Sequence, residues 1–374
     1  MKVKILFVID GMEFGGGERV FTQIINGLPL DQYESFLASG PQDSFYQAIS
    51  QTPVQRYPVD FSNRFNPAIM FRLIKIIKDN QIAIVHGQGA RAEFFARLAS
   101  GFSRKTMYVS TVQMPVEGYD VGPMKMLLYG AFDRFSERFV DRFLVVSSVL
   151  AQSMIQGHGI PQEKVVKIYN GIETDHYKPR DQEEGRRRVR QEYSVNDNEI
   201  LIGSLGRLVW QKGFEYFLQS IPILIQEIPG ARFMLVGEGS LRQELERQAR
   251  LLGIQDRLVF TGHRSDIRDI MAAMDVVVIP SLLEGFPMIT LEAMAMEKPI
   301  VTTSIDGIME QITDGREGLL IAPKNPPALA QAVKRLVDDP DYARSLGINA
   351  RAKVVRDFSV HKMIAETIKV YETL

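Results

Sequence analysis

The chain has 374 residues, of which 45% are hydrophobic and 24% are charged. This length exceeds one typical core and suits two domains of ordinary globular composition. The formal net charge of −1 gives no sign of a nucleic-acid-binding protein, and the absence of cysteine excludes disulfides and thiolate metal sites. No apolar run approaches the roughly 18 residues of a membrane span, and the first residues resemble a strand rather than a signal peptide. We therefore expect a cytoplasmic protein.

Short apolar runs alternate with longer amphipathic runs along the first half, which is typical of parallel sheets with crossover helices. Strands are predicted there at Val3–Ile9, Glu34–Ala38, Ile82–His86, Met107–Thr111, Phe143–Ser147 and Val165–Ile168. Helices are predicted between them at Glu18–Gly27, Pro67–Asp79, Arg91–Ser100, Met124–Val140 and Val149–Gln156. This pattern breaks near residue 175, where we place a domain boundary.

A second series of apolar runs follows a polar, charge-rich stretch. It predicts strands at Ile200–Leu205, Arg232–Val236, Leu258–Thr261, Asp275–Ile279, Pro299–Thr302 and Gly318–Ile321. The chain is therefore predicted to be an α/β protein of two facing, Rossmann-like, doubly wound domains. The predicted domains are residues 1–175 and 176–358, and residues 359–374 form a final helix that can pack on either one.

Two glutamates, Glu284 and Glu292, flank a short apolar segment that follows the predicted strand Asp275–Ile279. The segment opens an apparent helix, and the unpaired amides of a helix N-terminus favour an anion such as phosphate. If the helix starts near Phe286, Glu292 lies about two turns inside it and Glu284 stays in the loop. The two carboxylates could then hold two ends of one polar ligand at the carboxyl edge of a parallel sheet.

Two cations, Arg207 and Lys212, follow the first strand of the second half, between Gly206 and Gly213. A planar guanidinium and a compact ammonium at this edge of the sheet suit a diphosphate. The plain alternative is that both are solvated surface side chains, which is the commoner fate of Arg and Lys.

Two further strands of the second half end in turns that admit a ligand close to the backbone. One turn contains Gly237 and Gly239, and the other contains Gly262, His263 and Arg264. Backbone groups at these turns could read the edge of a flat base.

Three consecutive glycines, Gly15–Gly17, follow the first strand and allow a close approach of a ligand to the backbone. They do not form a dinucleotide fingerprint, and a tight strand–helix turn is the plain alternative. The pair Asp339 and Asp341 flanks a proline and is interpreted as a helix cap rather than a metal clip. No histidines show metal-ligand spacing, so we expect no metal site.

Four segments follow one another in the order of a known family: Gly15–Arg19, Arg207–Lys212, Gly237–Gly239 and Glu284–Glu292. Over nearly its whole length the chain resembles a bacterial group-1 glycosyltransferase of the retaining family 4, which has the GT-B fold. The resemblance implies that the second domain binds a nucleotide diphospho-sugar and the first binds the acceptor. It also implies that the final helix crosses back to the first domain.

The resemblance assigns catalytic roles to Arg207 and Lys212, which would hold the diphosphate, and to Glu284, which would contact the donor sugar. Glu292 would take the ribose hydroxyls. The other implied donor contacts are Gly15, Gly16, Gly206, Gly237, Gly239, His263, Arg264, Gly285, Phe286, Pro287, Met288 and Ile289. Implied contacts to the acceptor or the sugar are Glu18, His86 and Gln113. The implied mechanism is retaining, front-face transfer without metal or cofactor, in which the donor phosphate takes the acceptor proton.

Three departures from the family pattern leave the donor sugar open. Gln113 stands where many relatives have a histidine, His86 is the one histidine left of a frequent pair, and Pro287 replaces a frequent glycine. By family frequency we expect a UDP-sugar first and a GDP-sugar next. The expected acceptor is a glycan or a lipid-linked molecule of polysaccharide or other glycoconjugate biosynthesis.

The helices predicted at residues 67–79 and 124–140 mix apolar side chains with Lys and Arg. They could rest on an anionic membrane at its cytoplasmic face, or they could be ordinary core-facing helices. Two other functions remain open: a sugar-nucleotide epimerase of the same fold, and a non-catalytic subunit that binds a nucleotide sugar. Retention of the full set Arg207, Lys212, Glu284 and Glu292 argues against the non-catalytic subunit.

Overall fold

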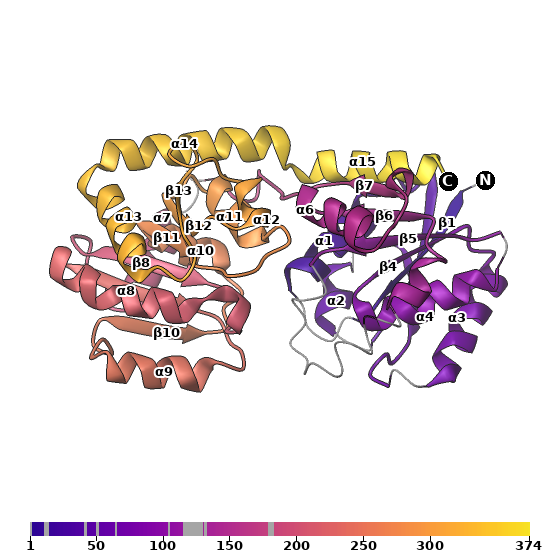
Figure 1. Cartoon of the computed structure of the whole chain (residues 1–374), viewed down its shortest axis with the longest axis horizontal. Helices are drawn as coiled ribbons and strands as arrows, with labels where there is room; N and C mark the ends of the chain where they lie inside the picture. Colours follow the sequence, from indigo (N-terminus) through magenta and orange to yellow (C-terminus); the bar gives the residue numbers. More distant parts are fainter. Residues whose placement is uncertain are drawn as a thin grey trace. The chain divides into compact units, whose positions relative to one another are not determined.

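The computed structural model describes residues 2–10, 15–40, 43–49, 52–63, 66–103, 105–114, 130, 133–178 and 183–374. The chain forms two compact units (Figure 1), residues 1–171 with 360–374 as the first and residues 172–359 as the second. The division falls between Gly171 and Ile172, rather than near residue 175.

The sheet of the first unit is parallel, with strand order β3-β2-β1-β4-β5-β6-β7. Its strands are β1 (Val3–Ile9), β2 (Tyr33–Ser39), β3 (Val54–Pro58), β4 (Ile84–Gln88), β5 (Met107–Val112), β6 (Arg142–Val145) and β7 (Val165–Lys167). Strands succeed one another outward from β1 on one side and from β4 on the other. The switch point of the sheet therefore lies between β1 and β4.

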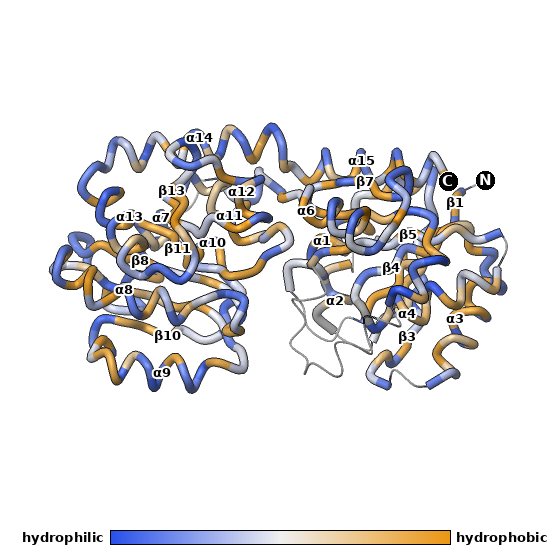
Figure 2. The backbone as a smooth tube through the Cα atoms, viewed as in Figure 1, coloured by the Kyte–Doolittle hydropathy of each residue, from blue (hydrophilic) through white to orange (hydrophobic). Residues whose placement is uncertain are grey.

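Helices cover the faces of this sheet because each strand is connected to the next by a crossover. They are α1 (Gly16–Gly27), α2 (Asp43–Ala48), α3 (Pro67–Asn80), α4 (Ala90–Gly101), α6 (Ser148–Gln152) and α15 (Val360–Glu372). Their residues alternate between hydrophobic and hydrophilic along the helix, as Figure 2 shows for α3 and α15. Of the helix predicted at 124–140, residues 124–129 and 131–132 lie outside the described residues, and 133–137 are helical.

The side chain of His86, on β4, is completely buried and joins α15 to the sheet. Its Nδ1 lies 2.5 Å from the hydroxyl of Tyr371 on α15, and its Nε2 lies 2.6 Å from the hydroxyl of Thr111 on β5. Burial lowers the pKa of His86 to about 3, so the ring is neutral. The structure contradicts the predicted sugar contact of His86, because the side chain has no exposed surface and both ring nitrogens already have partners.

A buried ion cluster ties α4 to the short helix at residues 133–137. The guanidinium of Arg97 donates to Glu93 Oε2 at 3.1 Å and also pairs with Asp133. Burial raises the pKa of Glu93 to about 7. At the edge of the cluster, His158 Nδ1 lies 2.6 Å from Glu137 Oε1, and this hydrogen bond raises the pKa of His158.

The sheet of the second unit is also parallel, with strand order β10-β9-β8-β11-β12-β13. Its strands are β8 (Ile200–Leu205), β9 (Ala231–Val236), β10 (Leu258–Gly262), β11 (Val276–Ile279), β12 (Ile300–Thr303) and β13 (Leu319–Ile321). All six strands predicted in this half are found. The switch point lies between β8 and β11.

The helices of the second unit pack on both faces of its sheet (Figure 1). They are α7 (Glu183–Glu192), α8 (Phe214–Glu227), α9 (Arg242–Leu251), α10 (Ile267–Ala273), α11 (Met288–Ala295), α12 (Asp306–Met309), α13 (Pro326–Asp338) and α14 (Pro340–Asp357). Asp339 Oδ1 accepts a hydrogen bond from the amide of Tyr342 at the start of α14. The prediction that this aspartate caps a helix is confirmed.

Candidate functional site

The loops that follow β8 and β11 meet at the switch point of the second unit, which is where open parallel sheets bind ligands. Lys212 comes from the loop after β8 and Glu284 from the loop after β11. Lys212 Nζ donates to Glu284 Oε1 at 2.6 Å, with side-chain exposures of 19% and 4%. The structure thus brings together two residues that are far apart in the sequence and that were both predicted as catalytic.

Glu284 has a second partner that the sequence did not suggest. The hydroxyl of Ser281, which is itself buried, donates to the same Oε1 at 2.7 Å. Two hydrogen bonds therefore converge on one oxygen of this carboxylate. Ser281 lies in the predicted loop, but its residue type alone carried no signal of this contact.

The site loop from Ser281 to Pro287 is braced by backbone contacts. Gly213, with φ of +61°, adopts a left-handed conformation, and a Cβ added there would lie 2.2 Å from the carbonyl oxygen of Pro280. A Cβ added at Gly307, on α12, would lie 2.2 Å from the carbonyl oxygen of Gly285. The buried side chain of Gln311 donates to the carbonyl of Pro287 at 3.1 Å. Sequence reasoning missed Gly307 and Gln311, because neither belongs to a motif at this loop.

Helix α11 begins at Met288, with Pro287 at its N-cap and no side-chain cap. It starts later than the predicted Phe286, because the backbone of Pro287 is extended, with ψ of 129°. Glu292 is therefore about one turn inside the helix instead of two. The hydroxyl of Tyr177 donates to Glu292 Oε1 at 3.1 Å, and both side chains are buried. Phe286 is also buried, with its ring 5.2 Å from that of Phe358.

The glycines at the ends of β8 and β9 allow two loops to touch through their backbones. Gly237 has φ of +134°, and a Cβ added there would lie 1.9 Å from the carbonyl oxygen of Gly206. A Cβ added at Gly239 would lie 2.5 Å from the carbonyl oxygen of Leu208. These contacts give Gly237 and Gly239 a packing role that holds the loop carrying Arg207, whose side chain is exposed.

The turn after β10 carries His263 and Arg264, whose side chains have different surroundings. His263 is exposed, as a ligand contact requires. The guanidinium of Arg264 instead pairs with Asp266 at 2.8 Å and with Glu192 at 2.5 Å. The hydrogen bonds to these two carboxylates raise the pKa of Arg264. The side chain of Arg264 is thus paired with two acidic residues of its own unit, and a donor contact at this turn stays a prediction.

A second group of predicted residues meets at the switch point of the first unit. Gly15–Gly17 start α1 after β1, and Gln88 ends β4. A Cβ added at Gly17 would lie 3.1 Å from Gln88 Nε2. The carboxylate of Glu18 turns back onto the amide of Gly15 at 3.0 Å, so this predicted acceptor contact acts as a helix cap.

Gln113 lies beside this turn in a chain of amides. Asn170 Nδ2 donates to Gln113 Oε1 at 2.9 Å, and Gln113 Nε2 lies 3.4 Å from Gln88 Oε1. Each amide oxygen of the two glutamines thus accepts from a neighbour, which leaves Gln88 Nε2 and the second hydrogen of Gln113 Nε2 to donate. The sequence pointed to Gln113 but gave no signal for Gln88 or Asn170.

Comparison with known protein families assigns both halves of the chain. Residues 14–176 match the family described as Glycosyltransferase Family 4, and residues 199–339 match Glycosyl transferases group 1. The chain belongs to the group-1, family-4 glycosyltransferases. The resemblance drawn from the sequence is confirmed.

Curated relatives of this glycosyltransferase are similar over different shares of its length. An uncharacterized glycosyltransferase of Methanocaldococcus jannaschii is 32% identical over 61% of this chain and 59% of its own length. A UDP-Gal:alpha-D-GlcNAc-diphosphoundecaprenol alpha-1,3-galactosyltransferase of Escherichia coli is 25% identical over 99% of this chain and 97% of its own. The match to the first of these thus spans less than two thirds of that relative.

Solved structures confirm the fold predicted for this glycosyltransferase. HepE of Anabaena, crystallised with UDP and glucose, has a TM-score of 0.87 at 22% identity, with 100% of each chain covered. WaaG, a glycosyltransferase involved in lipopolysaccharide biosynthesis, has a TM-score of 0.77 at 16% identity, covering 98% of this chain and 99% of its own. The two parallel sheets with their helices thus form the two Rossmann-like domains of the GT-B fold.

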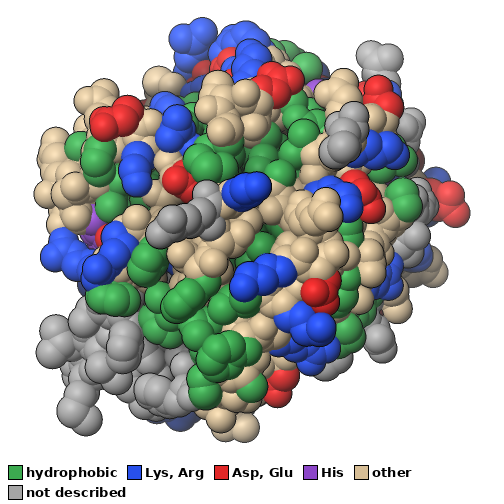
Figure 3. Space-filling view, turned by 90° about the vertical axis from the view of Figure 1, so that its right-hand side faces the viewer, with side chains coloured by type: hydrophobic (Ala, Val, Ile, Leu, Met, Phe, Trp, Pro, Cys, Tyr) green, Lys and Arg blue, Asp and Glu red, His purple; other side chains and the backbone are tan. Residues whose placement is uncertain are grey.

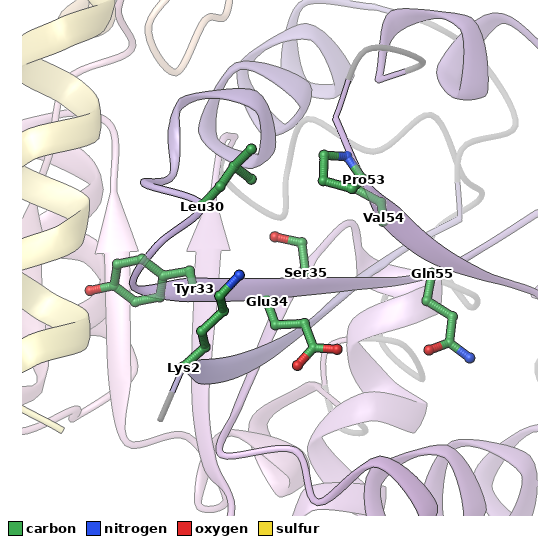
Figure 4. Close-up of a pocket in the computed structure, with 8 residues that line it drawn as sticks. All are labelled: Lys2, Leu30, Tyr33, Glu34, Ser35, Pro53, Val54 and Gln55. Atoms are coloured by element: carbon green, nitrogen blue, oxygen red, sulfur yellow. The ribbon is translucent and has the colours of Figure 1, made fainter.

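One pocket of the glycosyltransferase, of about 630 Å³, lies away from these groups in the first unit (Figure 4). It is lined by residues at the amino ends of β1, β2 and β3, among them Lys2, Tyr33, Glu34 and Gln55. Ligands of open parallel sheets bind at the opposite, carboxyl ends. This pocket is therefore not the candidate site.

The described part of the glycosyltransferase contains neither a cluster of metal ligands nor a helix that could span a membrane. No three His, Asp or Glu side chains in that part are arranged to hold a metal ion. None of its described helices combines the length and the hydropathy that a membrane span requires.

Proposed function

We propose that this chain transfers a hexose or an N-acetylhexosamine from a UDP-sugar to a glycan or a lipid-linked acceptor, with retention of anomeric configuration. The contact between Lys212 and Glu284 carries the proposal. It places a cation that suits a diphosphate beside a carboxylate that suits a sugar hydroxyl, at the switch point of the second unit. In this function the second unit holds the donor and the first unit holds the acceptor.

The leaving group of the reaction is a nucleoside diphosphate, so charge develops on its β-phosphate oxygen. Lys212 and Arg207 supply positive charge, and α11 supplies an N-terminus without a side-chain cap. Together they stabilise that oxygen without a metal ion. The same phosphate takes the proton of the acceptor hydroxyl as the new glycosidic bond forms on the face that the diphosphate leaves. No side chain is then required as general base.

The carboxylates share the recognition of the donor. Glu284 accepts a hydrogen bond from a hydroxyl of the sugar, while Glu292 accepts from the ribose. UDP is the proposed nucleotide because HepE was crystallised with UDP and glucose, and because the donor of the Escherichia coli relative is UDP-Gal. A GDP-sugar is the next choice.

The first unit offers uncharged N–H groups that can donate hydrogen bonds to the molecule that receives the sugar. Gln88 is almost completely buried, yet no described residue accepts from its Nε2, which lies beside the start of α1. Gln113 and the amides of Gly16 and Gly17 complete this edge. The acceptor of the Escherichia coli relative is a diphosphoundecaprenol-linked sugar. A glycan or a lipid-linked acceptor of polysaccharide biosynthesis is the class that we propose here.

A lipid-linked acceptor requires the enzyme to reach a membrane surface. Helix α3 buries the apolar residues Ile69, Leu73, Ile76 and Ile77, but its Phe71 is 63% exposed. The neighbouring cations Arg72, Lys75 and Lys78 are exposed as well. Figure 3 shows hydrophobic side chains between lysines and arginines on a face of the molecule. We propose peripheral binding of α3 to anionic lipid at the cytoplasmic face.

Sedimentation with vesicles checks this membrane contact. The chain is expected to bind vesicles that contain anionic lipid and not neutral vesicles. Replacing Phe71 by Ser is expected to weaken the binding. Equal sedimentation with both kinds of vesicle, or with neither, would contradict the contact.

Donor binding and transfer are tested together. Thermal unfolding is followed with UDP, GDP and ADP, each with and without Mg²⁺, because a ligand of the folded state raises the midpoint. The nucleotide that binds defines the base, and its sugars are then offered with a lipid-linked acceptor analogue. NMR of the product gives the anomeric configuration, and retention without Mg²⁺ is expected.

A matched pair of lysine variants shows whether the activity belongs to this site. Lys212→Ala removes a lysine 2.6 Å from a carboxylate at the site, and Lys334→Ala removes one at the same distance from Asp338, on α13. Only Lys212→Ala is expected to lose most of its glycosyl transfer activity, and both variants are expected to fold. Near-normal transfer by Lys212→Ala would refute the diphosphate role. Nucleotide binding without transfer would favour a sugar-nucleotide epimerase or a non-catalytic subunit.

A further inference from the structure

We propose that Ser281 is a positioning residue, which holds Glu284 so that one defined oxygen meets the donor sugar. This inference rests on the proposed donor site and adds a residue outside the Glu284–Glu292 element. Ser281 touches no reacting atom in this scheme. It acts only through the carboxylate beside it.

The hydrogen bonds of Glu284 are unequally divided between its two oxygens. Oε1 accepts from Lys212 Nζ at 2.6 Å and from Ser281 Oγ at 2.7 Å. No described residue donates to Oε2. The side chain is only 4% exposed, so the carboxylate is held almost entirely by these two contacts to Oε1. Oε2 is the oxygen that is left to accept a hydrogen bond from a ligand.

Lys212 cannot keep Glu284 in place through the whole reaction. The diphosphate of a bound donor competes with Glu284 for the same ammonium group. Whenever Lys212 turns to the phosphate, Glu284 loses one of its two hydrogen bonds. The hydroxyl of Ser281 has no such competitor and keeps Oε1 in place, so Oε2 stays directed at the sugar.

Ser281 can hold the carboxylate because its own backbone is fixed on both sides. Its carbonyl oxygen accepts from Thr303 Oγ1 on β12 at 2.5 Å. The next amide, of Leu282, donates to the carbonyl oxygen of Gln211 at 2.7 Å. A serine on so constrained a backbone loses little freedom when it forms its hydrogen bond, which makes it an efficient support for a catalytic side chain.

The chemistry at Oε2 defines what this support is for. A carboxylate oxygen accepts hydrogen bonds and cannot donate, so its partner must be a hydroxyl or an amide N–H of the sugar. In the proposed donor site the ribose hydroxyls donate to Glu292, so Oε2 of Glu284 is left for the sugar. Loss of the Ser281 hydroxyl should therefore weaken binding of the sugar and leave binding of the nucleotide unchanged.

The test compares Kd values for UDP and for UDP-glucose, UDP-galactose and UDP-N-acetylglucosamine by isothermal titration calorimetry. The wild type is compared with Ser281→Ala, Ser281→Thr and Ser220→Ala. Ser220 is a matched control, because it is buried in the same unit and its hydroxyl donates to the carbonyl of Phe217 at 2.6 Å. Thermal unfolding of each variant reports whether it folds.

In Ser281→Ala, the affinity for UDP should change by less than about threefold. The sugar-dependent gain in affinity, which is the ratio of Kd for UDP to Kd for the UDP-sugar, should fall about tenfold, as expected for the loss of a hydrogen bond to a charged group. Ser281→Thr, which retains a hydroxyl, should restore most of that gain, and Ser220→Ala should match the wild type. Equal weakening of UDP and UDP-sugar in Ser281→Ala would overturn the inference, and so would an unchanged gain. If the wild type binds none of the four ligands, the proposed UDP-sugar donor fails and this inference fails with it.

Discussion

Replacing Glu284 by Gln should have opposite effects on UDP and on a UDP-sugar. The amide keeps the size of the side chain and an oxygen that Lys212 and Ser281 can still reach. It removes the negative charge that holds Lys212 before the donor binds. UDP should therefore bind more tightly to Glu284→Gln, although a predicted catalytic residue has been lost.

The size of the effect follows from the Lys212–Glu284 contact. Its distance is 2.6 Å, and the exposures of 19% and 4% place it in a partly desolvated site. A hydrogen bond between charged groups contributes about 1.5–3 kcal/mol, and about 1.4 kcal/mol corresponds to a tenfold change in Kd. Because the diphosphate can share the ammonium with Glu284, we take the lower end. The expected gain for UDP is therefore about tenfold.

The sugar of the donor reverses this gain. Its hydroxyl meets a charged acceptor in the wild type and a neutral amide in the variant, at a cost of a similar 1.5 kcal/mol or about tenfold. The ratio of Kd for UDP to Kd for the UDP-sugar should therefore fall by at least about tenfold. Transfer should fall as well, because the sugar is less well oriented.

Fluorescence of Trp210 gives a direct assay. It is the only tryptophan of the chain, it is 39% exposed, and it lies two positions before Lys212. Titrations with UDP and UDP-glucose are compared between the wild type, Glu284→Gln and Glu317→Gln. Glu317 is a matched control, because it is also buried and lies 3.7 Å from Lys353 Nζ.

Weaker UDP binding to Glu284→Gln would refute the reasoning, since it would mean that the carboxylate supports the diphosphate instead of competing with it. An unchanged UDP affinity would show that Lys212 serves both partners at once. The same shifts in Glu317→Gln would mean that the effect is not specific to the site.

Three other substitutions test separate parts of the structure. Tyr177→Phe removes the hydroxyl on Glu292, so UDP should bind about threefold to tenfold more weakly in calorimetry, whereas 2′-deoxy-UDP should be affected less. His158→Gln should destabilise the chain more at pH 5.5 than at pH 8.5 in thermal unfolding. The hydrogen bond that His158 donates to Glu137 raises the pKa of His158, so the stabilisation is present below the unfolded pKa of about 6.5 and is lost as the pH rises through the folded value. Gly307→Ala should cost about 1–3 kcal/mol of stability and weaken UDP-glucose binding, because its methyl meets a backbone oxygen of the site loop.

Each of these substitutions has a clear contrary result. Equal weakening of UDP and 2′-deoxy-UDP in Tyr177→Phe would remove the ribose from the role of Glu292. A difference between wild type and His158→Gln that does not shrink at high pH would show that the charge of His158 is irrelevant. For the glycine, Gly230→Ala is the control, since a Cβ there meets nothing within 4 Å. If both glycine variants behave alike, the site loop is not braced at Gly307.

Strands buried in the sheets were predictable because their side chains form nearly continuous apolar runs. Strand β3 was missed because it is an edge strand whose side chains are partly or largely exposed and include the polar Gln55 and Arg56. The amphipathic periodicity of α3 was clear, and its Asn66 cap and Pro67 marked its start. Propensity and pattern thus identify elements that bury a face, and they fail for elements that do not.

Long-range contacts decide what the sequence could say about the site. Lys212 and Glu284 were predictable because each belongs to a recognisable motif that follows a strand at the carboxyl edge of the sheet. Ser281 and Gln311 act through a single hydrogen bond each, and a lone polar residue has no spacing to reveal its partner. His86 was misassigned for the same reason, because the buried partner that claims it, Tyr371, lies 285 positions away in the sequence.

The long sequence separation of His86 and Tyr371 also determines how the first unit can fold. Helix α15 supplies Tyr371 to the buried ring of His86, and Ile364 approaches so closely that a Cβ on Gly27 of α1 would lie 2.1 Å from it. A ribosome makes residues 172–359 before it makes α15. The second unit can therefore fold while the first still lacks the helix that packs on His86 and Gly27. Bringing such distant segments together carries the entropy of closing a long loop and slows the last step of folding. Expression of the first unit alone would therefore require residues 360–374 to be joined to it. A simple truncation after Gly171 would leave exposed the surface that α15 covers.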